Sequence, residues 1–114
     1  MKKLIVGLVL AQAFLISNAS ANTTKGQEIF ETKGCTICHK SDVDTIGPSL
    51  RTIATHYLGK ERDLLSYLQG QGTPIVNPSR AAVMEPQLIK IRSLFEDDMS
   101  DLAKYIVSAN DRPF

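Results

Sequence analysis

The pentapeptide at residues 35–39, CTICH, contains both cysteines of this 114-residue chain and one of its two histidines. A chain of this length predicts a single domain, and a small domain often relies on an added staple such as a disulfide, a metal or a cofactor. A disulfide between Cys35 and Cys38 would close a very small loop. Because disulfides stabilise mainly by constraining the unfolded chain, and more so for longer loops, this pair predicts a chemical role rather than a structural one.

Three chemical roles fit two thiols at this spacing. A thioredoxin-like redox site is expected beside a βαβ pattern, and the chain shows no convincing strand run. A zinc site needs four ligands, and only His56 remains among the cysteines and histidines outside the pentapeptide. The third role is covalent haem attachment, for which Cys-x-x-Cys-His is the sequence signature. Thiols three positions apart share one side of a helical turn, so they can reach one porphyrin edge while His39 reaches the iron. The pattern favours haem c over the other two.

The first 21 residues resemble a secretory signal peptide. Lys2 and Lys3 precede a largely apolar segment at residues 4–16, and residues 19–21 supply the small side chains that a signal peptidase recognises. The apolar segment is shorter than the roughly 20 residues that span a bilayer. We therefore expect residues 1–21 to be removed on export to the periplasm, with no stable membrane insertion afterwards.

Cleavage would leave one domain at residues 22–114. The 13 basic residues would fall to 11 against 12 acidic residues, which changes the net charge from +1 to −1. Nucleic-acid-binding domains usually carry a basic surplus, so this balance gives no support to that class. It also argues against a polybasic membrane patch.

Helical patterns dominate this domain and predict an all-α fold with long connecting loops. The first helix is expected at residues 25–33, capped by Thr24 and ended by Gly34. A second is expected at residues 61–69, with Gly70 after its end.

Two further helical segments are expected in the C-terminal half. A short turn begins at Pro78 and runs through residue 82, and Pro86 interrupts the chain again. The last helix begins between residues 93 and 97, where Ser93 and Glu96 could form a capping box. Residues 47–50, Gly-Pro-Ser-Leu, predict a rigid turn.

An iron that only transfers electrons needs a ligand on each haem face, and the candidates for the second are Met84, Met99 and His56. Met99 lies in the acidic last helix, where methionine is more often a core residue. His56 suits a polar surface or a position beside the haem propionates. Met84 lies between prolines in a segment expected to be a loop that could carry its sulfur to the iron. We expect His39 and Met84 to be the axial ligands.

These residues together resemble class I c-type cytochromes, in particular the small bacterial single-haem type called cytochrome c-551 or c-552. The resemblance covers essentially all of the domain. It rests on Gly26 and Phe30 in the first helix, the pentapeptide, residues 47–50, the methionine segment at 84–86 and the final helix at 102–106. One departure is that Glu85 separates Met84 from Pro86, whereas the family commonly has proline directly after the methionine.

The resemblance implies roles for residues outside the pentapeptide. Gly26 would let the first and last helices cross closely, with Phe30 and Tyr105 packed at the crossing. The carbonyl of Pro48 would accept a hydrogen bond from His39, which orients the imidazole. The possible partners of the haem propionates are Arg51, His56 and Tyr57.

The implied fold is the cytochrome c fold, with about four short helices around one haem c held by two thioether bonds from Cys35 and Cys38. The implied function is one-electron transfer between respiratory redox partners in the periplasm, by a monomer that binds them transiently and is not an enzyme. The alternative is a haem c subunit of a larger periplasmic oxidoreductase, for example one that oxidises sulfur compounds.

Overall fold

The computed structural model describes residues 19–114, with side chains from residue 24 onward. Of the predicted signal peptide, residues 1–18 lie outside the described residues. Five α-helices and three short 3-10 helices form the described part, which contains no strand, so the predicted all-α fold class is confirmed. None of the described helices has the length and hydrophobicity needed to cross a bilayer. The helices are α1 (Ala19–Thr32), η1 (Cys35–Ile37), α2 (Leu50–His56), α3 (Glu61–Leu68), η2 (Pro78–Arg80), α4 (Ala81–Ile91), α5 (Glu96–Val107) and η3 (Ser108–Asp111).

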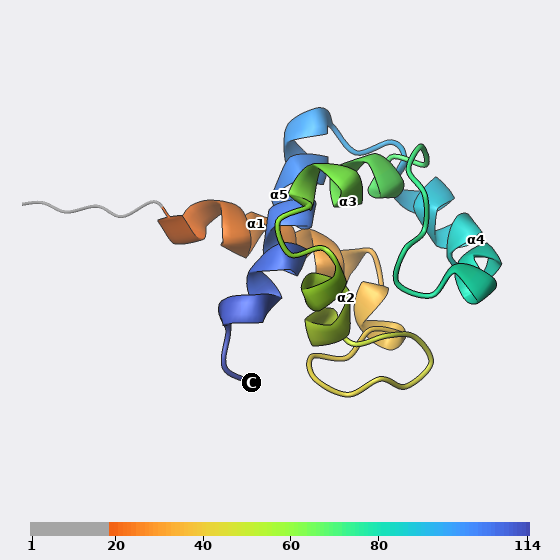
Figure 1. Ribbon diagram of the computed structural model, residues 1–114. Coiled ribbons are helices and arrows are strands. Elements are labelled where there is room, and N and C mark those ends of the chain that lie inside the picture. The colour runs from red at the N-terminus through yellow and green to blue at the C-terminus, as the bar shows by residue number, and fades with distance from the viewer. Residues whose placement is uncertain (1–18) are drawn as a thin grey trace, which may run out of the picture.

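The first and last helices cross in close contact, as Figure 1 shows. Gly26 makes this possible, because a Cβ atom there would overlap the carbonyl oxygen of Asp101 and lie 2.5 Å from the Cβ of Tyr105. One turn further along α1, the rings of Phe30 and Tyr105 pack with their centroids 5.5 Å apart. The close helix crossing implied by the family resemblance is therefore present.

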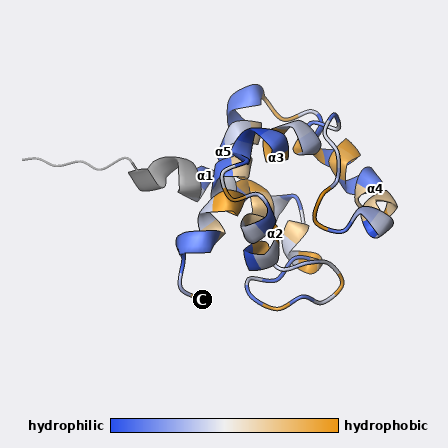
Figure 2. Ribbon diagram, in the orientation of Figure 1, coloured by the Kyte–Doolittle hydropathy of each residue, from blue (hydrophilic) through white to orange (hydrophobic). Residues whose placement is uncertain are grey.

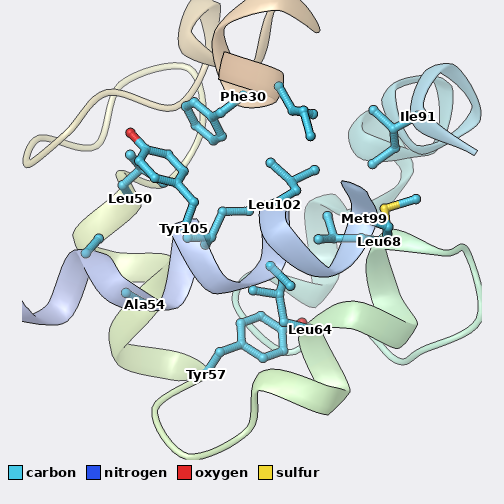
Figure 3. Packing of buried hydrophobic residues seen from close by; sticks show 14 of the residues in the cluster. Phe30, Leu50, Ala54, Tyr57, Leu64, Leu68, Ile91, Met99, Leu102 and Tyr105 are labelled. Atoms are coloured by element: carbon cyan, nitrogen blue, oxygen red, sulfur yellow. The ribbon is translucent and has the colours of Figure 1, made fainter. Parts of the chain in front are cut away.

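Helix α5 forms the centre of the core, and α2 and α3 pack against it (Figure 3). Leu102 is 1% exposed, and Met99 on the same helix is 3% exposed. Leu64 on α3 and Tyr57 in the turn before α3 both approach α5. Hydrophobic and hydrophilic residues alternate along these helices (Figure 2), as expected for helices that bury one face.

Helix α2 was not predicted. Its N-cap is Ser49, whose Oγ accepts a hydrogen bond from the backbone N–H of Thr52 at 3.0 Å. Leu50 and Ala54 then bury one face of the helix. With two buried residues in seven, this helix is too short to show a recognisable hydrophobic period. The expected rigid turn at residues 47–50 leads into it. The described chain thus has five α-helices where about four helical segments were expected.

Helix α4 corrects the prediction for the methionine segment. Residues 81–91 form a continuous α-helix that includes both Met84 and Pro86, so Met84 does not lie in a loop. Proline removes one hydrogen bond and crowds the carbonyl four residues earlier, which normally disfavours this position. Burial of Leu88 and Ile91 on the following turns compensates, because tertiary packing routinely outweighs local propensity.

Two predicted caps are also wrong, although two predicted helix ends are right. α1 begins at Ala19, so Thr24 lies inside the helix rather than at its cap. α5 begins at Glu96 after Phe95, without a side-chain cap and without a Ser93 capping box. Acidic residues fill the first turn of α5 and complement the helix dipole there. Gly34 and Gly70 follow α1 and α3 with φ of 79° and 83°, as a helix-ending glycine requires.

Candidate haem site

A cavity lies between α4 and the other helices. Figure 1 shows α4 at the edge of the molecule. Cys35, Cys38 and His39 line it from one segment, and Met84 lines it from α4. Leucine and isoleucine side chains of α3 and α5 and the loop at residues 74–76 complete the mainly apolar walls. The space between the walls measures about 1290 Å³, including the part that opens to solvent.

The pentapeptide is shaped to present both thiols to this cavity. The positive φ of Gly34 ends α1 and starts η1, in which the backbone N–H of Cys38 donates to the carbonyl of Cys35 at 3.3 Å. Both cysteines are half-buried and line the cavity, whereas Thr36 and Ile37 between them are exposed. No disulfide joins the two thiols. Burial raises the pKa of the Cys35 thiol, while its own backbone and Lys90 oppose this shift.

His39 is held by the turn at residues 47–50. Its Nδ1 lies 2.7 Å from the carbonyl oxygen of Pro48. A carbonyl oxygen can only accept, so Nδ1 carries the proton and Nε2 has a lone pair that can bind a metal. A Cβ atom on Gly47 would lie 3.0 Å from the imidazole Cε1, so the backbone approaches the ring closely. The N–H of Gly47 donates to the carbonyl of Cys38 at 3.0 Å. The hydrogen bond from His39 to the Pro48 carbonyl, which the family resemblance implies, is therefore present.

Asp44 completes this turn and was missed in the sequence. Its Oδ1 accepts hydrogen bonds from the Ser49 backbone N–H at 2.7 Å and from the Thr52 hydroxyl at 2.9 Å. The bond from the Ser49 N–H, followed by the Thr52 hydroxyl, holds the pKa of the Asp44 carboxyl below its usual value. Its only sequence signal is a carboxylate a few residues before a Pro-Ser turn, and many surface loops contain one.

Met84 alone of the three candidate second ligands lines the cavity. It is half-buried and packs against the core from α4. Met99 is buried within the core on α5 and does not line the cavity. His56 is exposed, and its Nδ1 lies 2.9 Å from the carbonyl oxygen of Thr52 in its own helix.

Of the three candidate propionate partners, only Tyr57 lines the cavity. Burial, with smaller contributions from Tyr67 and Asp63, raises the pKa of Tyr57 to about 12. Arg51 instead donates to the Asp42 carboxylate at 2.6 Å. Sequence reasoning missed several polar or charged residues that line the cavity, because the packing of separate segments brings them together: Lys33, Tyr67, Asn77, Arg80 and Gln87.

The residues around the cavity fit a haem c. Two thiols line one wall of the cavity. The His39 imidazole follows them in the chain, with its Nδ1 hydrogen-bonded to Pro48, and the Met84 thioether lines the same cavity from α4. Haem iron is commonly bound by histidine and methionine, and apolar walls suit the porphyrin. In the described part of the chain no three His, Cys, Asp or Glu residues form a group that could hold a bare metal ion.

Comparison with known proteins agrees with this chemistry. Residues 23–110 match the family model described as "Cytochrome c". A stretch of 35 residues is 43% identical to the protein named "Cytochrome c-551" from Azotobacter vinelandii, and it covers 31% of this chain and 43% of that relative. The match thus spans less than half the length of the relative. The chain belongs to the cytochrome c family as a class I c-type cytochrome, and its cofactor is one covalently bound haem c, whose attachment motif Cys35 and Cys38 fit.

Proposed function

We propose that this protein is a one-electron carrier between respiratory redox partners in the periplasm, with His39 and Met84 as axial ligands. The observation that carries the proposal is that both side chains line one cavity, from two separate elements, together with the two thiols. The chemistry that haem supplies when bound is one-electron exchange between ferrous and ferric iron. Membership of a family of haem-based electron carriers supports this function.

The residues around the site suit electron transfer rather than substrate chemistry. Pro48 orients the His39 imidazole and leaves its Nε2 available, so this ligand would not need to move between oxidation states. The Met84 thioether is a soft ligand that favours the ferrous state, which raises the reduction potential. Leucine and isoleucine walls exclude water and disfavour the additional positive charge of ferric iron.

The ligand assignment is tested by comparing Met84→Ala with Met99→Leu in the holoprotein. M84A should lose the methionine-to-iron charge-transfer band of the ferric spectrum, and its ferrous form should bind carbon monoxide. M99L is the matched control on α5. It should keep the band and lose less than about 1.5 kcal/mol of stability, because the replacement conserves volume. An unchanged M84A spectrum, or loss of the band in M99L instead, would reject Met84 as the ligand.

The periplasmic location is part of the same proposal and depends on removal of residues 1–21. Cleavage after Ala21 would keep the contact between Gly26 and α5, since Gly26 lies within the remaining chain. The test is an intact-mass measurement on the protein from a periplasmic fraction. The expected mass is that of residues 22–114 plus one haem, and a full-length mass would contradict the export proposal.

The proposal also holds that the carrier is a monomer with transient partners and not an enzyme. Membership of a family of electron carriers supports this part of the proposal. Size-exclusion chromatography of native material should show a species of domain size. Stable co-elution with a larger oxidoreductase would support the alternative role as a haem c subunit.

A further inference from the structure

The peptide group between Pro48 and Ser49 is hydrogen-bonded on both sides. Its carbonyl oxygen accepts from the His39 Nδ1–H at 2.7 Å, and its N–H donates to the Asp44 carboxylate, also at 2.7 Å. A peptide unit is planar and conjugated, so its N–H and C=O groups respond together to a charge at either end. Asp44 and His39 are therefore linked through one peptide, although they do not touch.

We propose that Asp44 is a positioning and tuning residue that strengthens His39 as an iron ligand through the Pro48–Ser49 peptide, and so lowers the reduction potential. This inference depends on the proposed ligation of iron by His39. A carboxylate that accepts from the N–H pushes electron density through the conjugated peptide toward the carbonyl oxygen, which then becomes a stronger acceptor. A stronger acceptor on Nδ1–H makes the imidazole more basic at Nε2, and a more basic ligand stabilises ferric iron.

The surroundings of Asp44 hold its carboxylate ionised and in place. Thr52 donates its hydroxyl to Asp44 at 2.9 Å, the Ser49 hydroxyl donates to Thr52 Oγ1 at 3.2 Å, and the Thr52 backbone N–H donates to Ser49 Oγ at 3.0 Å. Both hydroxyl protons in this series of hydrogen bonds, those of Ser49 and Thr52, have an acceptor. The bonds therefore run in one direction and end on Asp44. These same bonds lower the pKa of the Asp44 carboxyl, which is therefore charged at neutral pH.

The geometry at the other end of the peptide is equally constrained. Gly47 lies against the imidazole and donates its N–H to Cys38, while the Thr45 N–H donates to the carbonyl of Gly47 at 3.0 Å. Ser49 is 1% exposed and Pro48 is half-buried, so the peptide is largely buried although Asp44 is itself exposed. Solvent and salt screen the direct field of an exposed charge. They do not interrupt a path of hydrogen bonds through a buried peptide.

The test is Asp44→Asn in the holoprotein, because asparagine keeps an oxygen acceptor for the Ser49 N–H and removes the charge. The expected result is an upfield shift of the His39 Nδ1–H proton resonance. The equilibrium constant for reduction should rise about two- to twentyfold, if the bond to His39 weakens by the 10–30% attributed to cooperative polarisation. A tenfold change would correspond to 59 mV for a one-electron couple.

Asp42→Asn is the matched control in the same loop. Asp42 is exposed and pairs with Arg51 at 2.6 Å, and no hydrogen bond joins it to the Pro48–Ser49 peptide. D42N should leave the His39 Nδ1–H resonance unchanged and alter the potential only at low salt. In 1 M salt, where the Debye length is about 3 Å, the D42N effect should vanish and the D44N effect should persist.

Two further variants keep the proposal falsifiable if D44N folds poorly. Asp44→Glu retains the charge and should keep the resonance and the potential near the wild-type values. Asp44→Ser provides a second neutral oxygen and should behave like D44N. Two results for the neutral variants would overturn the proposed link from Asp44 to His39: an unchanged His39 Nδ1–H resonance, or a shift in reduction potential that disappears in 1 M salt. A wild-type spectrum without low-spin histidine-ligated haem would instead contradict the proposed function itself.

Discussion

Replacing Gly26 with alanine sets two opposing effects against each other at the crossing of α1 and α5. Alanine inside a helix is favoured over glycine by up to about 1 kcal/mol. The added Cβ would overlap the carbonyl oxygen of Asp101 and crowd the Cβ of Tyr105. Overpacking typically costs about 1–3 kcal/mol, and the upper end applies here because a backbone carbonyl cannot rotate away. The net expectation is a loss of about 2 kcal/mol.

A guanidinium titration of the holoprotein, followed by far-ultraviolet circular dichroism, measures this loss. In a domain of this size, a loss of about 2 kcal/mol should also lower the melting temperature in a thermal unfolding experiment by roughly 10 °C. Gln27→Ala is the matched control, since Gln27 is exposed and bonds only to Glu31 at the surface, and it should change stability by less than about 0.5 kcal/mol. If G26A proves as stable as the wild type, helix propensity outweighs the crossing contact and the account of α1 packing is incorrect.

Two further predictions concern the turn beside His39. Ser49→Ala removes the N-cap of α2 and should cost about 0.5–2 kcal/mol in a chemical denaturation experiment, and no loss would show that the cap is dispensable. The pKa of Asp44 lies below its unfolded value of 3.8, so its contribution to stability is present above that pH and is lost as the pH falls through the folded pKa. The acid limb of the stability curve should therefore be shallower in D44N than in the wild type, and identical limbs would remove Asp44 from the acid response.

Local patterns in the sequence were sufficient for some parts of this protein. Glycine after an apolar stripe marked the ends of α1 and α3, because only a residue that tolerates positive φ continues the chain there. The same patterns failed at Pro86, where burial of the next turns of α4 outweighs the missing hydrogen bond. They failed at Thr24 and Ser93 too. Thr24 lies inside α1, which already begins at Ala19, and Ser93 precedes α5, which begins only at Glu96.

By itself, the sequence determined the all-helical class and the attachment chemistry, since both depend on residues that are close in the chain: helical periodicity and the spacing of Cys35, Cys38 and His39. Only the tertiary structure decided that Met84, and not Met99 or His56, shares a cavity with His39. It also decided that one peptide joins Asp44 to His39. The physical reason is that these relations depend on how the turn at residues 40–49 closes and where α4 lies, and those are set by packing between segments that no local pattern connects.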